Sequence, residues 1–297
     1  MILVTGATGF IGSRLLKRLT TGREPLRGAS RTASAENVPP GVDPVHCELT
    51  DPETLARPLR EVDTVVHAAA ITANLKEPYR GAYDRINRIG TENLVAAAKA
   101  AGVRRIVLLS GLVQPPVKRG SYMATRVAME EAVRSSGIPF TILQPSVLFG
   151  DGAEFVAALA GVSSWSPVLP VMGPPEMLFQ PLWIGDLLRG LEDCVTRDVH
   201  LGKTLPLGGA EYVTFRQVLQ TILAATKRRR LLLPLPMPVA RFQAVLMTAL
   251  LPHPPLTPAT LELFGFDNKT DLDSVERTFG FKPRGFREHL LAHGIDR

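Results

Sequence analysis

Three glycines near the start of the sequence have the spacing of an anion-binding turn. Gly6, Gly9 and Gly12 stand three residues apart, between the apolar run 2–4 and a helical pattern over 11–19. A pyrophosphate can approach a main chain closely only where side chains are absent, and the free N–H groups and dipole of a helix N-terminus attract it. The glycines therefore predict a pyrophosphate site where the first strand meets the first helix. A plain tight turn is the alternative for glycines taken alone.

A second candidate phosphate ligand follows the next strand. Residues 26–32 read LRGASRT, so the end of this strand carries Ser30 and Arg31 and no acidic residue. At this place an acidic side chain binds the ribose of NAD, whereas an arginine accepts the 2′-phosphate of NADP. Arg31 therefore predicts NADP(H) rather than NAD(H). The alternative is a solvated surface arginine.

The elements that must position these residues alternate between strand and helix. Strands are expected over 2–4, 26–30, 44–46, 63–70 and 103–110, and 140–150 as a strand followed by a loop; helices are expected from residue 11, over 87–101 and over 122–136. This rhythm is typical of an α/β fold with a doubly wound parallel sheet. After residue 150 it stops, and prolines cluster at 167–181 and 234–258.

The same change of pattern suggests how the chain is divided. We expect residues 1–150 to form an NADP(H)-binding Rossmann domain whose sheet is completed by about 181–205. Residues 151–180 and 206–297 should form a smaller, mainly helical lobe for a substrate or partner.

The glycine motif T-G-x-x-G-x-x-G resembles the short-chain dehydrogenase/reductase superfamily, in its extended and atypical branches, which include NAD-dependent epimerases and dehydratases. Four further segments are similar to that family: DTVVHAAA (63–70), residues 86–110, FTILQPSVLFG (140–150) and PLWIGDL (181–187). The resemblance covers most of the chain. It implies an NAD(P)-binding Rossmann fold and hydride transfer.

The resemblance also implies catalytic residues, with departures from the family pattern. The family uses a tyrosine as general acid/base, a lysine four residues later, and a serine or threonine at the end of the fifth strand. In SYMATRVAMEEAVR (121–134), Tyr122 matches the tyrosine and Arg126 occupies the lysine position. The fifth strand ends in LLSGL, so Gly111 falls at the hydroxyl position and Ser110 lies one residue earlier. Tyr122, Arg126 and Ser110 are the catalytic candidates. The alternative is that Tyr122 only lines the ribose pocket and the protein catalyses no reaction.

The remaining family positions imply cofactor contacts. Glu48 stands where the family often has an aspartate near the adenine. Asn87 either anchors a water or a strand carbonyl, or is a satisfied structural asparagine. His67, in an apolar strand, is expected in the core. The full set of expected cofactor-binding residues is Gly6, Thr8, Gly9, Phe10, Ile11, Gly12, Ser30, Arg31, Glu48, Leu49, Ala68, Ala69, Ala70, Asn87, Leu109, Pro145, Ser146 and Val147.

Three functions fit these observations. The first is an NADP(H)-preferring reductase that transfers hydride to a carbonyl or quinone-like lipophilic molecule. The second is a catalytically silent NADPH-binding structural or assembly protein of a membrane complex, because residues 254–290 resemble bacterial relatives of the nucleotide-binding accessory subunit of respiratory complex I. The third is a sugar-nucleotide epimerase or dehydratase, which the missing catalytic hydroxyl disfavours.

The composition limits the kinds of partner and site that we expect. The net charge of +6 points to an anionic partner, but no nucleic-acid-reading motif accompanies the basic residues, so no nucleic-acid partner is expected. The two cysteines, Cys47 and Cys194, have no metal-binding spacing, so we expect no metal site and a cytoplasmic, reducing environment. We expect no signal peptide, and the chain shows no uninterrupted apolar run of membrane-spanning length.

One segment leaves a choice open. Residues 227–251 join the basic run KRRR to an apolar helical pattern. The segment is either a core helix with a solvated basic edge or a peripheral contact with an anionic membrane, a membrane complex or an isoprenoid-like substrate.

Overall fold

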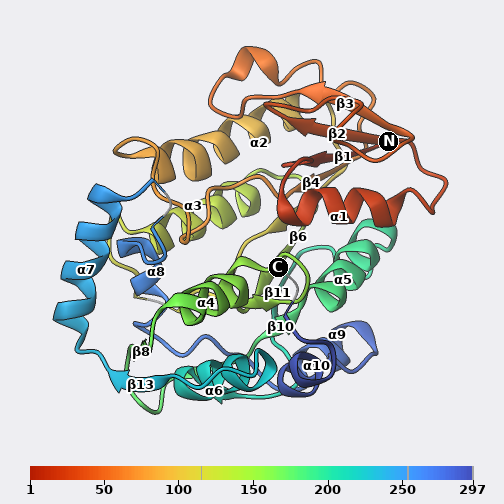
Figure 1. Ribbon diagram of the computed structural model, residues 1–297. Helices are drawn as coiled ribbons and strands as arrows, with labels where there is room; N and C mark the ends of the chain where they lie inside the picture. Colours follow the sequence, from red (N-terminus) through yellow and green to blue (C-terminus); the bar gives the residue numbers. More distant parts are fainter. Residues whose placement is uncertain (115, 253, 296–297) are drawn as a thin grey trace. The chain divides into compact units, whose positions relative to one another are not determined.

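The computed structural model describes residues 1–114, 116–252 and 254–295, and the chain forms two compact units (Figure 1). The first unit contains Met1–Ile71, Glu77–Gln144 and Leu188–Leu205. The second unit contains Thr72–Lys76, Pro145–Leu187 and Pro206–Arg297.

The first unit is built on a seven-stranded sheet with strand order β11-β6-β5-β4-β1-β2-β3. From β6 to β3, each strand runs parallel to its neighbour. The strands are β1 (Ile2–Thr5), β2 (Leu26–Ser30), β3 (Val42–His46), β4 (Thr64–His67), β5 (Arg105–Leu109), β6 (Phe140–Pro145) and β11 (Lys203–Leu207). The order reverses at β1, so β1 and β4 flank the switch point at which such sheets bind nucleotides.

Helices cover both faces of this sheet, which is why the central strands β1 and β4 are buried along their whole length. They are α1 (Phe10–Leu19), α2 (Gly90–Ala100), α3 (Tyr122–Arg134) and α5 (Ile184–Thr196), with the short helices η1 (Pro52–Thr54) and η2 (Asp84–Ile89, a π-helix). In Figure 1, α2 and α3 lie on one side of the sheet and α1 and α5 on the other. An ion pair between Arg18 and Glu192 joins α1 to α5.

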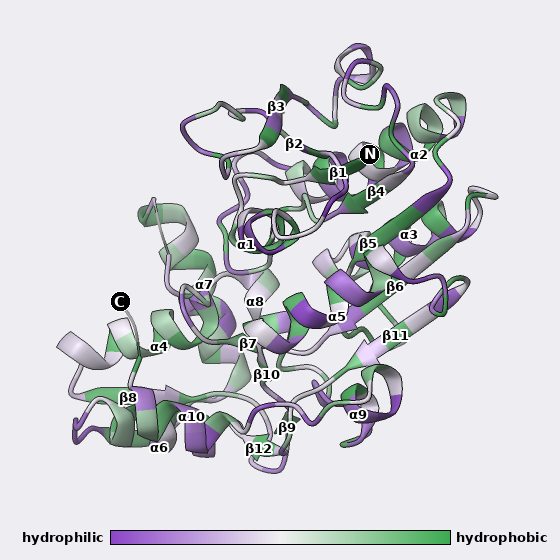
Figure 2. Ribbon diagram, turned by 90° about the vertical axis from the view of Figure 1, so that its right-hand side faces the viewer, coloured by the Kyte–Doolittle hydropathy of each residue, from purple (hydrophilic) through white to green (hydrophobic). Residues whose placement is uncertain are grey.

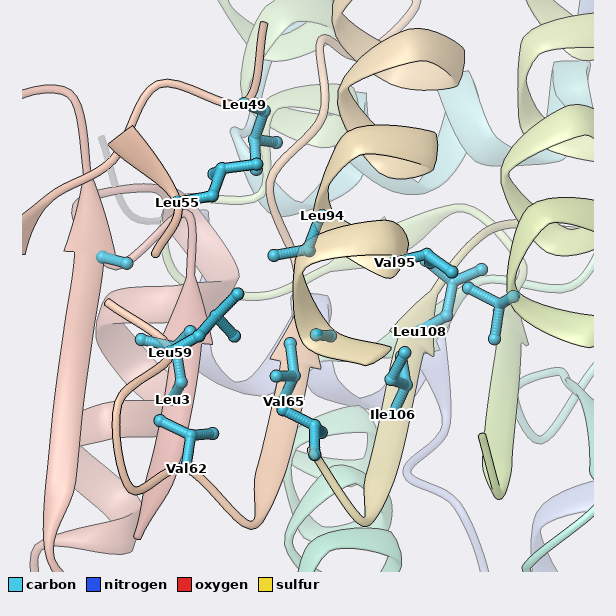
Figure 3. Close-up of a cluster of buried hydrophobic side chains, with 14 of the residues drawn as sticks. Leu3, Leu49, Leu55, Leu59, Val62, Val65, Leu94, Val95, Ile106 and Leu108 are labelled. Atoms are coloured by element: carbon cyan, nitrogen blue, oxygen red, sulfur yellow. The ribbon is translucent and has the colours of Figure 1, made fainter. Parts of the chain in front are cut away.

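Buried apolar side chains fill the core between the sheet and α2 (Figure 3). Leu3, Val65 and Ile106, from β1, β4 and β5, point toward Leu94 and Val95 of α2 and are buried. Because side chains alternate along a strand, the odd-numbered residues of β1 and β4 face α2. The expected α/β class with a doubly wound parallel sheet is confirmed.

The second unit has short strands and more helix. Its strands pair two by two, as β10 with β7, β12 with β9 and β13 with β8. Five phenylalanines, at positions 149, 179, 215, 264 and 286, form the centre of its core. The elements are β7 (Leu148–Phe149), α4 (Glu154–Trp165), β8 (Val168–Val171), β9 (Leu178–Phe179), β10 (Leu182–Trp183), β12 (Val213–Thr214), α6 (Phe215–Ala225), β13 (Leu231–Pro234), α7 (Met237–Leu250), α8 (Pro258–Glu262), α9 (Ser274–Phe279) and α10 (Phe286–His293). The helical C-terminal region is as expected.

Candidate functional site

The glycine turn forms the corner between β1 and α1. Gly6 has φ +70°, a conformation that glycine adopts without strain. A Cβ on Gly12 would lie 2.1 Å from the carbonyl oxygen of Gly6, so the helix can begin this close to the strand only without a side chain there. A Cβ on Gly9 would meet only that same oxygen, at 3.1 Å. The three glycines therefore produce a bare main-chain corner.

The N-terminus of α1 is uncapped by side chains. Gly9 is its N-cap residue and makes no side-chain cap hydrogen bond, and the first turn has no acidic residue. Unsatisfied N–H groups and the positive end of the helix dipole favour an anion at such a place. Phe10 opens the helix with its ring under Arg14, whose guanidinium carbon lies 4.6 Å from the ring centroid, and the partly buried Ile11 follows. The corner thus has the donors and the space that a pyrophosphate needs.

The structure brings Arg31 and Glu48 together. Arg31 Nε lies 4.0 Å from Glu48 Oε2, and the Arg31 side chain is 72% exposed. Glu48 Oε1 also accepts hydrogen bonds from the backbone N–H and the hydroxyl of Thr50, at 3.1 and 2.9 Å. An exposed pair at this distance is weak, so the guanidinium remains available to a phosphate.

Neighbouring positions support this corner. Thr8 Oγ1 donates to Ser30 Oγ at 3.2 Å, which links the glycine turn to the end of β2. The side chain of Leu49 is buried, and its carbonyl oxygen accepts a hydrogen bond from Asn93 at 3.0 Å. Leu49 therefore packs in the core behind the corner. A Cβ added to Gly90 would lie 2.9 Å from the Cβ of Leu49.

Small residues follow β4. Ala68, Ala69 and Ala70 are partly buried, and a Cβ on Gly6 would lie 3.0 Å from the Cα of Ala69. The end of β4 and the glycine turn are therefore in close contact. A larger side chain at these alanines would reduce the space beside the turn.

His67 is buried in the core beneath this corner, as expected. Its imidazole joins two hydroxyls, with Nδ1 2.8 Å from Thr5 Oγ1 and Nε2 2.9 Å from Thr91 Oγ1. Burial, with a smaller contribution from the charge of Arg126, lowers the pKa of His67 to about 3. The ring is neutral at neutral pH and ties β4 to β1 and α2.

Asn87 holds the segment that follows β4. The side chain is completely buried; its Oδ1 accepts from Ile71 N at 2.8 Å, and its Nδ2 donates to Ile71 O at 3.1 Å. A third hydrogen bond joins Nδ2 to Thr125 Oγ1 of α3, at 3.3 Å. Asn87 thus satisfies both main-chain groups of one residue and connects that residue to α3.

The structure joins the two catalytic candidates of α3 directly. Arg126 Nε donates to Tyr122 Oη at 2.8 Å, and the two side chains are buried, with residue exposures of 8% and 7%. Spacing of four residues places them on one face of the helix. Within the described part of the chain, no carboxylate lies within ion-pair distance of Arg126. The tyrosine hydroxyl is therefore the oxygen that this buried cation contacts.

Tyr83 is a residue that sequence reasoning missed. Its ring packs edge-on against Tyr122, with centroids 5.3 Å apart and planes at 74°. It directly precedes η2 and lies outside the segments that resemble the family, so no local pattern marked it.

Ser110 lies directly after β5, which ends at Leu109. The residue is buried, and its hydroxyl has no hydrogen-bond partner among the described residues. The neighbouring Leu109 is buried in the core. A buried hydroxyl is seldom left without a partner, so this one can bond a ligand or an ordered water.

The last three expected cofactor residues belong to the second unit. Pro145 ends β6, and Ser146 donates from its hydroxyl to Gln180 O and from its N–H to Leu207 O. Val147 N donates to Asn268 Oδ1 at 2.9 Å. The backbone of this segment is thus held by partners within the second unit.

Other kinds of site find no support in the described residues. Among residues 1–114, 116–252 and 254–295, no group of three His, Cys, Asp or Glu side chains could hold a metal ion. Burial raises the pKa of the Cys47 and Cys194 thiols to about 12, which makes both poor nucleophiles. No helix in the same part of the chain has both the length and the apolarity needed to span a bilayer.

Comparison with known proteins decides the family. A model of the NAD(P)H-binding family matches residues 6–161, which include the glycine corner, Ser110 and the Tyr122–Arg126 pair. The chain belongs to this NAD(P)H-binding family. It is a short-chain dehydrogenase/reductase of the atypical, epimerase/dehydratase-like kind, and it binds NAD(P)H. The closeness to complex I subunit relatives stays a prediction.

Two of the similar proteins are named as reductases. The chain is 28% identical over 181 residues to ceramide reductase of Caulobacter vibrioides; the match covers 58% of this chain and 54% of that enzyme. It is 24% identical over 317 residues to 2-alkyl-3-oxoalkanoate reductase of Stenotrophomonas maltophilia, with 95% and 94% covered.

A solved structure shows the same fold over almost the full length. The triphenylmethane reductase of Citrobacter, crystallised with NADP(H), superposes with a TM-score of 0.76 at 19% identity, covering 99% of each chain. At this identity the likeness concerns the fold alone.

Proposed function

We propose that the protein is an NADP(H)-dependent reductase of a carbonyl group on a lipophilic small molecule. The observation that carries the proposal is the buried hydrogen bond from Arg126 Nε to Tyr122 Oη, 2.8 Å long, within the segment that the NAD(P)H-binding family model matches. The names of two relatives, a ceramide reductase and a 2-alkyl-3-oxoalkanoate reductase, support a substrate with an aliphatic chain.

The chain's residues divide into those that hold the nucleotide and those that serve the substrate. The glycine corner and the N–H groups of α1 would bind the pyrophosphate, because the corner is bare and no acidic residue opposes the charge. Arg31 would bind the 2′-phosphate that distinguishes NADP(H), with Ser30 beside it. We assign the nucleotide to residues 1–150, completed by about 181–205, and the substrate to 151–180 and 206–297.

The cofactor, when bound, supplies the hydride; the proton must come from the chain. A guanidinium has donors and no acceptor, so the phenolic proton of Tyr122 is directed to something other than Arg126. In this proposal Tyr122 Oη gives its proton to the substrate oxygen. The permanent charge of Arg126, which has no carboxylate of the described residues within ion-pair distance, stabilises the negative charge that develops on Oη.

The hydroxyl of Ser110 completes the set. Its oxygen is buried and has no partner in the described chain, so a hydrogen bond to a carbonyl oxygen of the substrate would satisfy it. Gly111 has no hydroxyl to offer at the usual family position, which leaves Ser110 as the candidate on this strand.

The test is oxidation of NADPH by aliphatic ketones of increasing chain length, followed at the nicotinamide absorbance. Tyr122→Phe removes the proton donor and should reduce kcat by about a hundredfold or more. Tyr83→Phe is the matched control, because it removes a hydroxyl from the adjacent ring while keeping the edge-on contact, and it should keep activity. Equal kcat in Tyr122→Phe and the wild type would refute the assignment.

A second candidate function is an NADPH-binding protein without turnover. The observation that favours it is the pair of departures at Arg126 and Gly111, where the family has a lysine and a hydroxyl residue. In that case NADPH would raise the melting temperature strongly, while no ketone or quinone would oxidise the bound nucleotide.

A further inference from the structure

Helix α7 buries small residues and exposes its large apolar ones. Its buried residues are Ala240 and Ala244, both with no exposed surface, whereas its large apolar side chains face solvent. The exposed ones are Val239, Phe242, Val245, Leu246 and Leu250, of which Phe242 and Leu250 are about 70% exposed. A surface helix ordinarily buries its large apolar residues and exposes polar ones. Figure 2 shows α7 coloured mostly as hydrophobic.

The exposed residues form a continuous strip. Positions 239, 242, 246 and 250 are separated by three or four residues, so they lie along one face of the helix. Strand β13, which leads into α7, adds Leu231 and Leu233; they are two residues apart, on the same side of the strand, and exposed. We call β13 and the exposed face of α7 the apolar strip.

The chain segment that carries the apolar strip is basic. Residues 212–261 contain six Lys and Arg residues and no Asp or Glu, and the whole chain has a net charge of +6. The segment therefore accounts for the entire net charge. Lys227, Arg229 and Arg241 are exposed beside or within the strip. No carboxylate of the segment itself offsets them.

The basic run is anchored to the rest of the second unit. Arg228 Nη1 donates to Ala160 O at 2.9 Å, and Arg230 Nε donates to Ser163 O at 2.9 Å, both near the end of α4. That helix ends in Trp165, which is 73% exposed. Tryptophan favours the boundary between water and lipid because its ring is apolar and its N–H is polar.

We propose that the apolar strip, with Lys227, Arg229 and Arg241, docks the protein on the surface of an anionic phospholipid bilayer. An α7 of 14 residues is too short to cross a bilayer, but it can lie in the plane of the headgroups with its apolar face inserted. A second copy of the chain fits less well, because a two-fold contact through the strip would bring its positive charges together. The surface goes beyond the proposed reductase activity and does not depend on it.

Co-sedimentation of the full chain with vesicles tests this surface. Vesicles of phosphatidylcholine containing about one-third phosphatidylglycerol should bind the protein, and pure phosphatidylcholine should bind it at least about tenfold less. Lys227→Gln and Arg229→Gln should each weaken binding about fivefold, and about 0.5 M salt should do so in the wild type. Phe242→Ser combined with Leu246→Ser should reduce binding about tenfold or more.

Leu291→Ser is the matched control. Leu291 belongs to α10 and is 59% exposed, as Val245 is, but lies outside the strip, so its substitution should leave vesicle binding unchanged. Unchanged vesicle binding by the Phe242/Leu246 variant would overturn the proposal. So would an absence of vesicle binding together with a concentration-dependent dimer that the same variant abolishes, since the strip would then be an interface between copies.

Discussion

Gly12, in the first turn of α1, lies directly against the carbonyl oxygen of Gly6, at the end of β1: a Cβ on Gly12 would be 2.1 Å from that oxygen. The contact lies within the protein and exists without any ligand. The third glycine of the motif therefore serves the packing of helix on strand, while the region around Gly9 is where a pyrophosphate can approach. This division of roles separates stability from binding.

Gly12→Ala should destabilise the protein. The methyl group must displace main-chain atoms, so we expect a loss of about 1–3 kcal/mol in the free energy of unfolding, measured by urea denaturation. Gly161→Ala is the control: Gly161 lies in α4, and a Cβ there would meet nothing within 4 Å, so that variant should be stabilised by up to about 1 kcal/mol. Equal effects at the two positions would contradict the assigned role of Gly12.

Arg31 and Glu48 should affect cofactor choice in opposite directions. Arg31→Ala removes the proposed phosphate ligand and should weaken NADPH binding about tenfold or more, with little effect on NADH, because a charge-assisted hydrogen bond contributes about 1.5–3 kcal/mol. Glu48→Gln removes the carboxylate 4.0 Å from Arg31 Nε and should strengthen NADPH binding modestly. Calorimetric titration with both nucleotides measures each effect. Equal losses of NADPH and NADH in Arg31→Ala would argue against NADP(H) preference.

His67 should make stability depend on pH. Its pKa is lowered from 6.5 to about 3 in the folded chain, so the unfolded chain binds the additional proton first as pH falls. The stabilisation is complete above pH 6.5 and is lost progressively toward pH 3, at about 1.4 kcal/mol per pH unit. Urea unfolding at several pH values in this window should show a steeper decline in the wild type than in His67→Gln.

The control for that series is His46→Gln, since His46 is exposed. It should follow the wild-type pH dependence closely. A wild-type curve parallel to that of His67→Gln between pH 6.5 and 3 would show that the imidazole is not held neutral by its buried position.

Local patterns were enough to predict much of the first unit. The strand expected over 26–30 is β2, and the helix expected over 122–136 is α3, which ends two residues earlier, at Arg134. The strand expected over 63–70 ends earlier, at His67, because the alanines that follow turn away beside Gly6. The β13–β8 and β12–β9 pairs of the second unit were not predicted, because such short strands owe their existence to distant partners.

The site shows the same limit. The glycine spacing and the Tyr122–Arg126 spacing could be read from the chain, because both depend on residues close in sequence. The approach of Arg31 to Glu48 and the packing of Tyr83 on Tyr122 depend on segments that lie far apart in the chain and meet through the fold. The exposure of the apolar face of α7 could not be predicted either. Periodicity shows which face of a helix is apolar, but not whether other residues cover that face.

Ser110 allows a stabilising role and a catalytic role to be told apart. Its buried hydroxyl has no partner in the described chain, so Ser110→Ala removes an unpaired polar group and should leave the free energy of unfolding unchanged or slightly higher. The same variant should lower kcat for ketone reduction about tenfold or more, because the substrate oxygen would lose a hydrogen bond. Ser146→Ala is the converse control, since its hydroxyl donates to Gln180 O and its loss should destabilise the fold. If Ser110→Ala lowered stability and kept kcat, the hydroxyl would belong to the fold rather than to the reaction.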